Sequence, residues 1–316
     1  TRIHSVFPSS TAPAVTTLAT GLPPAQHSVT GWHLWWPEAQ SVVRPLPLDH
    51  RGREDPIDPH QLFHWQSLAA CLGPRMSVLQ PASIADSAFS AHAFGQHSRH
   101  AYDSIRQLGM KIETMVADAP HDGLYLYAYL PHFDSAAHEF GCDSPKALEV
   151  ARSCDALFAR LVESFKRHDV LVLAFADHGF IDVPAECLLR LESFPELAAC
   201  LASPLTGEPR VAFCHVKHDA QQAFEEAVKR RLDFAFECVP SRYLLETGWF
   251  GLPGQFDERL PERIGSHTLV ARDRFCLTQT LPGERPAKFI GMHGGVHEDE
   301  MLISVAAARM GQAIAA

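Results

Sequence analysis

The chain has 316 residues, of which 46% are hydrophobic and 20% are charged, a composition typical of a globular protein. That length suits one large α/β domain with insertions. A formal net charge of -10 argues against a nucleic-acid scaffold, because phosphate backbones select basic surfaces. No apolar run could cross a bilayer and no signal peptide opens the chain, so we expect a cytoplasmic protein without a membrane segment.

The N-terminal part predicts a strand that ends near Phe7, followed by a helix between Ser9 and Gly21. Pro13 suits the first turn of that helix, and Gly21 suits its C-terminal stop. Thr11 would lie at the helix N-terminus, where free N–H groups and the helix dipole favour an anion. One hydroxyl is therefore expected where a phosphate group could bind.

Residues 32–81 are rich in Pro, Trp, His and Arg, and we expect them to form a lid or long connection with short helices. A strand is predicted at 76–79. A helix is predicted at 101–117, because apolar residues recur there at a spacing of three or four. Trp32, Trp35 and Trp36 could stack on an aromatic group of a ligand, but packing within the lid is the more usual role.

Two apolar segments, 124–130 and 170–175, predict buried strands, and a helix opened by Ser144 and Pro145 joins them. The order strand, helix, strand gives a βαβ unit and a parallel sheet. The fold class that we expect is therefore α/β, with a central mostly parallel sheet flanked by helices in a single domain.

The C-terminal half interrupts this pattern with a small α+β subdomain at residues 206–275. Its expected elements are strands at 211–216 and 234–239 around a helix at 220–232. A short strand at 288–291 is predicted to return the chain to the main fold.

Carboxylates and imidazoles follow three of the predicted strands, beside short turns. Asp134 and His138 follow 124–130, Asp177 and His178 follow 170–175, and His293 follows 288–291. Loops beyond the carboxyl ends of parallel strands converge on one crevice, and zinc accepts both ligand types. Singly, each segment is more simply a cap, turn or loop. Together they predict a metal site with more ligands than one ion needs.

The same residues carry a resemblance to a known family. The segment from Phe7 to His27 resembles the nucleophile segment of the nucleotide pyrophosphatase/phosphodiesterase family, within the alkaline phosphatase superfamily. Tyr129 to Gly141 is similar to a second family segment. Ala174 to Gly179, and Gly291 to Gly295 followed by Glu300, match the last two. The matches come in family order and cover nearly the whole chain.

The resemblance implies an alkaline-phosphatase-like fold and two zinc ions, although aspartate and histidine also accept manganese or iron. One ion would be held by Asp134, His138 and His293, and the other by Asp177, His178 and Thr11. Thr11 would attack phosphorus to form a phosphothreonine intermediate, which water then hydrolyses.

One departure concerns a further aspartate ligand, which the family carries on a first strand before the nucleophile. The chain begins after that point. That first strand is therefore expected to be missing, and the second metal site to be incomplete unless another residue replaces the aspartate.

The implied function is hydrolysis of a small phosphoester, with a phosphodiester or nucleotide pyrophosphate favoured over a monoester. A sulfatase is disfavoured, because the chain has no Cys-x-Pro-x-Arg segment. Two alternatives stay open. One is a phosphomonoesterase of the same superfamily, and the other is a degenerate member that binds a phosphorylated ligand without hydrolysing it.

Overall fold

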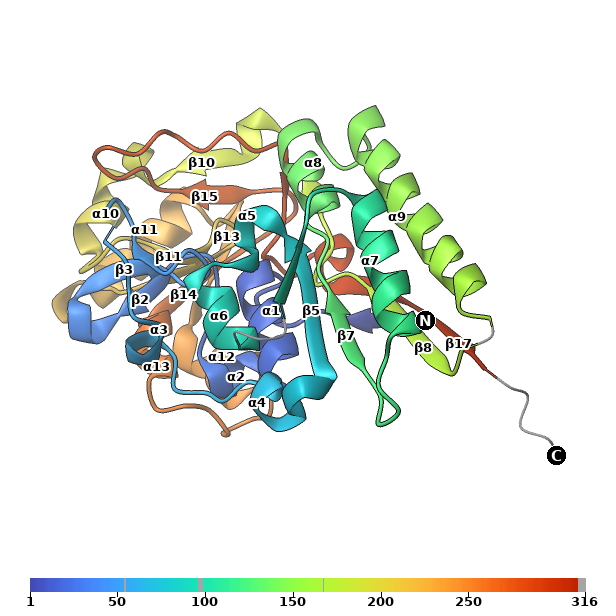
Figure 1. The fold of residues 1–316 in the computed structure, drawn as a ribbon. Coiled ribbons are helices and arrows are strands. Elements are labelled where there is room, and N and C mark those ends of the chain that lie inside the picture. Colours follow the sequence, from blue (N-terminus) through green and yellow to red (C-terminus); the bar gives the residue numbers. More distant parts are fainter. Residues whose placement is uncertain (54, 96–98, 167, 312–316) are drawn as a thin grey trace.

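A computed structural model describes residues 1–53, 55–95, 99–166 and 168–311 (Figure 1). Its parallel sheet has the order β6 (Arg99–Tyr102), β5 (Met76–Pro81) and β7 (Tyr125–Ala128). The strands predicted at 76–79 and 124–130 are thereby confirmed. The start of the helix predicted at 101–117 is wrong. Helix α7 (Ile105–Ala117) begins only after Ser104, whose hydroxyl accepts a hydrogen bond from the Gln107 N–H.

A second sheet has the order β1 (Arg2–His4), β17 (Leu302–Met310) and β8 (Val170–Phe175), and both pairs are antiparallel. The strand predicted at 170–175 is confirmed, but its parallel pairing and full burial are not. β8 pairs with β17 in the antiparallel direction along its whole length. Alternate side chains of a strand point to opposite faces, and the face of β8 that points away from the core is exposed. Leu171 and Leu173 are 60% and 53% exposed.

The two sheets share a covering layer of α7 and α9 (Pro145–Ser164), which run alongside each other over β7 and β8 in Figure 1. Ser144 caps α9 by accepting the Ala147 N–H at 3.1 Å, as the predicted helix start requires. One buried cluster joins both helices to both sheets, through residues that include Leu79, Leu108, Leu161, Met310 and the partly buried Leu126 and Val172. The loops after β7 and β8 are therefore held by one core.

Helix α1 (Thr11–Thr20), at the centre of the view in Figure 1, confirms the helix predicted between Ser9 and Gly21. Gly21 ends it in the left-handed conformation, at φ 72°. Helix α2 (Pro24–His27) follows. Two further short helices, α5 (Ala82–Ala85) and α6 (Ala88–Phe94), follow β5.

Residues 32–81 contain more regular structure than the predicted lid. Besides helices α3 (Pro59–Leu62) and α4 (Leu68–Leu72), they form an antiparallel sheet of β2 (Leu34–Trp36), β3 (Ser41–Arg44) and β4 (Asp49–His50). Leu34 and Val43 are fully buried in the same core as α1. This short sheet therefore packs as part of the domain.

The α+β subdomain contains a four-stranded antiparallel sheet with the order β11 (Thr206–Glu208), β12 (Val211–Cys214), β14 (His267–Ala271) and β13 (Phe236–Pro240). Both predicted strands and the predicted helix are present, the latter as α11 (Gln221–Arg231). Neighbouring helices are α10 (Pro195–Cys200), α12 (Ser241–Glu246) and α13 (Leu260–Ile264). Figure 1 shows β10, β11 and α11 at the end of the molecule away from α9.

Helix α8 (His132–Phe140) follows β7, helix α14 (Glu298–Met301) precedes β17, and two small strand pairs lie outside the sheets above. β10 (Leu188–Arg190) runs parallel to β15 (Cys276–Thr278), and β9 (Ile181–Asp182) is antiparallel to β16 (Gly291–Met292). The strand predicted at 288–291 is wrong in its bounds, because β16 shares only Gly291 with it and residues 288–290 are not in a strand. In the part of the chain that the structure describes, no helix has both the length and the apolar character to span a membrane.

Candidate metal centre

The predicted ligands come together from three elements. Asp134 and His138 lie one turn apart on α8 (His132–Phe140), which follows β7, so both face the same side of the helix. Asp177 and His178 directly follow β8, and His293 directly follows β16. The structure thus brings the three strand-end segments to one place, although β8 and β16 are antiparallel to β17 and β9 and do not lie in the parallel sheet from which this convergence was predicted.

Asp134 is the common neighbour of three imidazoles. Its Oδ1 lies 3.5 Å from His138 Nε2, 3.7 Å from His293 Nε2 and 4.0 Å from His178 Nε2. The ligand atoms of Asp134, His178 and His293 all lie within 4.8 Å of one another. One ion could reach all of these atoms with small side-chain movements.

The three imidazoles present the same nitrogen to this space. Each Nδ1 faces a backbone carbonyl oxygen: Gly291 for His138 at 2.8 Å, Gly179 for His178 at 2.9 Å and Ser9 for His293 at 3.2 Å. A carbonyl only accepts, so Nδ1 carries the proton and the Nε2 lone pair points at Asp134. This arrangement orients histidines for metal binding.

Asp134 supplies the test of whether a cation fits. Its Oδ1 is buried and has no hydrogen-bond partner, which is costly for a carboxylate oxygen. A zinc ion between Oδ1 and the Nε2 atoms would supply the missing partner, and the donor atoms are those that zinc prefers. The residues therefore fit the implied metal.

The pKa values of two ligands show how strongly these groups interact. Burial, and then the neighbouring His178 and His138, lowers the pKa of His293 well below its ordinary value. Burial also lowers the pKa of His138, but the adjacent Asp134 carboxylate favours the protonated ring and outweighs burial, so the net shift is upward. A bound cation would replace the proton that Asp134 favours on His138.

Thr11 reaches the cluster from the N-terminus of α1. Its Oγ1 lies 3.0 Å from His178 Nε2, and Asp177 Oδ2 lies 3.6 Å from the same nitrogen. The second predicted ligand set, Thr11, Asp177 and His178, is therefore contiguous with the first. His178 Nε2 is the atom that the other two members of this set approach.

Tyr129 is a neighbour that the sequence motif contained but left without a role. Burial together with the charges of Asp177 and Asp134 raises its pKa far above the ordinary value, against a smaller opposing effect of the neighbouring Thr11. The phenol therefore stays protonated beside Thr11. Phe180 forms an apolar wall, with ring centroids 5.1 to 5.3 Å from those of His138, His178 and His293.

Glu208 is a buried carboxylate beside the site that sequence reasoning missed. It ends β11 of the α+β subdomain, accepts the Trp32 N–H at 2.7 Å and accepts a short hydrogen bond from the Ser10 hydroxyl. Burial raises its pKa to about 7, against the opposing effect of both hydrogen bonds and of His178 and His138. No local pattern singled it out, because its partners lie about 180 residues away.

Arg210 and Glu300 hold the loop after His293. The Arg210 Nε lies 2.7 Å from Glu300 Oε1, and both side chains are fully buried. Glu300 also accepts the Gly295 N–H at 2.8 Å, and the Ser9 hydroxyl donates to the Gly295 carbonyl at 2.8 Å. Glu300 lay within a matched family segment, whereas nothing in the sequence indicated Arg210.

Two glycines of the motifs are required by close approach. A Cβ on Gly179 would lie 1.9 Å from the Asp299 carbonyl oxygen, so packing against that backbone excludes a side chain there. Gly294 has φ +104°, and a Cβ on it would lie 2.7 Å from the Glu208 Cβ. Gly179 and Gly294 therefore let the segments that carry His178 and His293 pack closely against Asp299 and Glu208.

The three tryptophans differ in position. Trp35 lies near His215, with ring centroids 5.3 Å apart, and Trp36 stacks on His50 at 5.9 Å. Both therefore pack within the protein. Trp32 is 39% exposed, and its backbone is the part that Glu208 holds.

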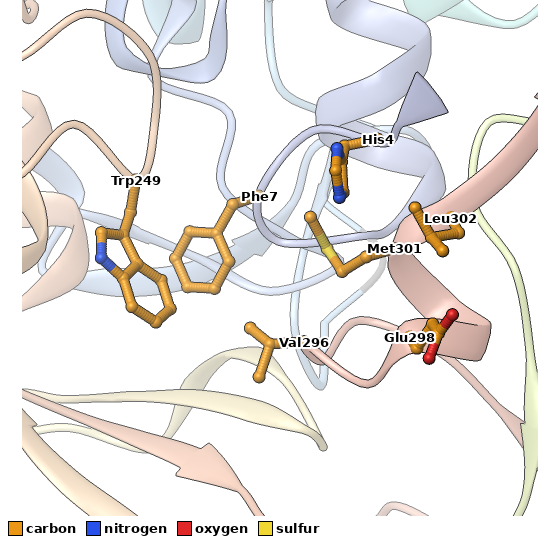
Figure 2. A pocket seen from close by; sticks show the side chains of 7 residues that line it. All are labelled: His4, Phe7, Trp249, Val296, Glu298, Met301 and Leu302. Atoms are coloured by element: carbon orange, nitrogen blue, oxygen red, sulfur yellow. The ribbon is translucent and has the colours of Figure 1, made fainter. Parts of the chain in front are cut away.

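A cavity of about 530 Å³ lies next to the nucleophile segment and the loop after His293. Figure 2 shows Phe7 and Trp249 on one side of it and His4 and Leu302 on the other. The Phe7 and Trp249 rings meet edge to face at 5.0 Å. None of the six predicted site residues lines this cavity, so it flanks the metal centre.

With this geometry in place, the comparisons with known proteins identify the class. The chain belongs to the type I phosphodiesterase / nucleotide pyrophosphatase family, which matches residues 1–295. The resemblance predicted from the motifs is confirmed. An uncharacterized pyrophosphatase/phosphodiesterase of Schizosaccharomyces pombe is 24% identical over 210 residues, which are 61% of this chain and 40% of that protein. The chain thus spans less than half of that relative.

Solved structures of ectonucleotide pyrophosphatase / phosphodiesterase 5 share the fold. The murine protein matches with a TM-score of 0.69 and 16% identity, covering 99% of this chain and 79% of its own. The human protein gives 0.67 and 16%, covering 97% and 78%. An inactive threonine-to-alanine variant of the murine protein, in complex with AMP, gives 0.67 and 16%, covering 98% and 79%. The expected alkaline-phosphatase-like α/β fold is therefore confirmed.

Proposed function

We propose that the chain hydrolyses small phosphoesters at a two-zinc site, through a phosphothreonine intermediate on Thr11. Phosphodiesters and nucleotide pyrophosphates are the preferred substrates over monoesters. The observation that carries the proposal is the Thr11 hydroxyl, 3.0 Å from His178 Nε2, at the edge of the group formed by Asp134 and the three imidazoles.

Two findings from relatives support the substrate class. The chain belongs to a family of phosphodiesterases and nucleotide pyrophosphatases. An inactive threonine-to-alanine variant of a protein with the same fold has been solved in complex with AMP, which is a product that cleavage of a nucleotide pyrophosphate would leave. A nucleoside monophosphate group is therefore the part of the substrate that we propose for this site.

The ligands divide as the resemblance implies: Asp134, His138 and His293 would hold one ion, and Asp177, His178 and Thr11 the other. Zinc bound there would act as a Lewis acid and stabilise negative charge on the phosphoryl and nucleophile oxygens. The buried Asp134 Oδ1 without a hydrogen-bond partner is the feature that fits such an ion best.

The residues of the chain would perform the transfer in two displacements. The Thr11 oxygen, held beside His178 Nε2, attacks phosphorus and gives up its hydroxyl proton while the bond to the leaving oxygen breaks and that oxygen gains a proton. The N–H groups at the start of α1 and its dipole stabilise the charge on the phosphoryl oxygens. Water then attacks phosphorus while the bond between phosphorus and the Thr11 oxygen breaks, one proton of that water returns to the Thr11 oxygen, and the phosphorylated product leaves.

The test compares the wild-type protein with Thr11→Ala after both are loaded with zinc. Hydrolysis is measured on bis(p-nitrophenyl) phosphate as the diester, p-nitrophenyl phosphate as the monoester and a dinucleotide as the pyrophosphate. Thr11→Ala is expected to lower kcat by about 10³-fold or more, with its zinc content close to that of the wild type. Thr114→Ala, on the exposed face of α7, is the matched control.

The outcomes separate the proposal from its alternatives. A Thr11→Ala variant that hydrolyses at the wild-type rate removes Thr11 from the mechanism. A wild-type protein that prefers the monoester is a phosphomonoesterase. A zinc-loaded wild type that binds AMP but cleaves none of the substrates is the non-catalytic family member.

A further inference from the structure

Glu208 joins the α+β subdomain to the nucleophile segment. Only 6% of the residue is exposed, and its Oε1 accepts both the Ser10 hydroxyl and the Trp32 N–H. Ser10 directly precedes Thr11, and a Cβ on Gly294, next to His293, would meet the Glu208 side chain. The carboxylate therefore lies between the two loops that carry the nucleophile and a ligand.

Ser10 behaves unusually for a residue at the start of a helix. It is the N-cap residue of α1, with extended backbone angles of φ -138° and ψ 155°, yet its side chain makes no capping hydrogen bond. A serine in this position normally accepts an N–H of the first turn, which stabilises a helix by about 1 kcal/mol. Here its hydroxyl is directed instead to Glu208.

That direction leaves the first turn of α1 uncapped by a side chain. Pro13 has no N–H and the Ala14 N–H is bonded to the Ser10 carbonyl, so the N–H groups of Thr11 and Ala12 are the ones that remain available for an anion. In the proposed function, those groups face the phosphoryl oxygens while Thr11 attacks. A serine hydroxyl that capped the helix would compete with the substrate for the same donors.

The position of Glu208 is fixed by its own strand. Gly207 pairs with His33 through two backbone hydrogen bonds, of 2.7 and 3.2 Å. A Cβ on Gly31 would lie 2.8 Å from the Gly207 backbone. β11 is thus pressed onto the turn before Trp32, and the carboxylate has little room to move.

We propose that Glu208 is a positioning residue for Thr11: it holds the Ser10 hydroxyl away from the N-terminus of α1, so that the first N–H groups stay free for a phosphoryl oxygen. This inference rests on the proposed function, in which Thr11 is the nucleophile. The α+β subdomain then contributes to the site through Glu208 Oε1, which accepts the hydrogen bond of the Ser10 hydroxyl.

The test is a double-mutant cycle on Ser10 and Glu208 in the zinc-loaded protein. Glu208→Ala releases the Ser10 hydroxyl to cap α1 and is expected to lower kcat roughly 10- to 100-fold. Ser10→Ala alone is expected to cost roughly threefold or less. The double variant should recover at least about threefold over Glu208→Ala, because the competing hydroxyl is gone. Glu237→Ala, an exposed glutamate of β13, should match the wild type.

Glu208→Gln tests whether the role is that of an acceptor. An amide oxygen can accept both hydrogen bonds now made to Oε1, so the rate should stay within about threefold of the wild type. Glu208→Asp keeps the charge but draws the acceptor back toward β11, and it should resemble Glu208→Ala. It also replaces the alanine variant in the cycle if that variant does not fold.

A second readout separates failure of this inference from failure of the proposed function. Binding of AMP to the zinc-loaded variants by calorimetry should weaken roughly tenfold in Glu208→Ala and recover partly in the double variant. That pattern would support the positioning role even in a wild type without turnover. A double variant no better than Glu208→Ala in both rate and AMP affinity, or a glutamine variant as impaired as the alanine variant, overturns the proposal.

Discussion

The strand-end loops and the α+β subdomain serve the site in different ways. Helix α8 after β7 and the loops after β8 and β16 carry Asp134, Asp177, His178 and His293, and Asp134 Oδ1 is left buried without a partner. The subdomain contributes Arg210, which is already paired within the protein through four hydrogen bonds to Glu300 and to two backbone carbonyls. The first region is arranged to bind a metal ion, and the second supports the segments that carry the metal-binding residues.

The difference has an energetic consequence. A ligand residue that lacks its ion destabilises the metal-free fold, since an unpaired buried carboxylate oxygen is costly. A buried ion pair whose partners are all in place becomes costly only when one partner is removed. Substitution of a ligand residue should therefore lower activity without lowering the stability of the metal-free protein. Substitution of a buried supporting residue should lower that stability.

The largest effect is expected for Asp134→Asn. The amide is a poor zinc ligand, so zinc content should fall and kcat/KM should drop by about 10³-fold or more. The metal-free variant should be at least as stable as the metal-free wild type, because a buried charge has been removed. Elemental analysis, kinetics and urea unfolding measure the three quantities. A variant that keeps its zinc and its rate would contradict the ligand assignment.

Arg210→Met should act in the opposite way. It leaves Glu300 buried without its cation, and the free energy of unfolding should fall by about 3 to 5 kcal/mol in the metal-free protein. Urea denaturation provides the measurement, with Arg242→Met on the exposed face of α12 as the matched control. A loss below about 1 kcal/mol would contradict the view that Arg210 stabilises the fold by neutralising the buried Glu300.

The free energy of unfolding of the metal-free wild type should depend on pH through Glu208, and Glu208→Gln should remove that dependence. The pKa of Glu208 is about 7 in the folded chain against an ordinary 4.5, so the folded state binds the proton more tightly. Stability of the wild type should therefore fall by about 3 kcal/mol as pH rises from 4.5 to 7, and then level off. The glutamine variant should lack this component. Parallel pH curves for the two proteins would be the contradicting result.

Gly294→Ala is expected to have the smallest effect of the four. A side chain at φ +104° is strained, and its Cβ would meet the Glu208 Cβ at 2.7 Å. The expected cost is about 1 to 3 kcal/mol of stability, together with a reduced kcat because Glu208 is displaced. Thermal unfolding and kinetics measure both, and Gly52→Ala serves as a control, since it combines positive φ with open space. Equal effects on kcat in the two variants would contradict a specific contact with Glu208.

The sequence was most informative where residue type and strand position coincide. Asp134, Asp177, His178 and His293 were recognisable because carboxylates and imidazoles follow apolar segments. The pairing itself was not predictable. β17 lies between β1 and β8 because of contacts across more than 100 residues, and the period of β8 alone does not specify a parallel or an antiparallel neighbour.

The supporting residues had no such local signal. Arg210 follows a proline in a turn of the subdomain, and its partner lies 90 residues further along the chain. Glu208 meets Ser10 across 198 residues. A buried charged residue and an exposed one look alike in a sequence, because burial depends on which distant segments pack around them.

The central claim is that Asp134, His138 and His293 bind a metal ion beside Thr11. It is tested most directly by an anomalous difference map, recorded at the zinc absorption edge from crystals of the zinc-loaded protein. The account predicts a peak at about 2.0 to 2.2 Å from a carboxylate oxygen of Asp134 and from Nε2 of His138 and His293. Crystals that contain zinc but show no peak among these three side chains would contradict it.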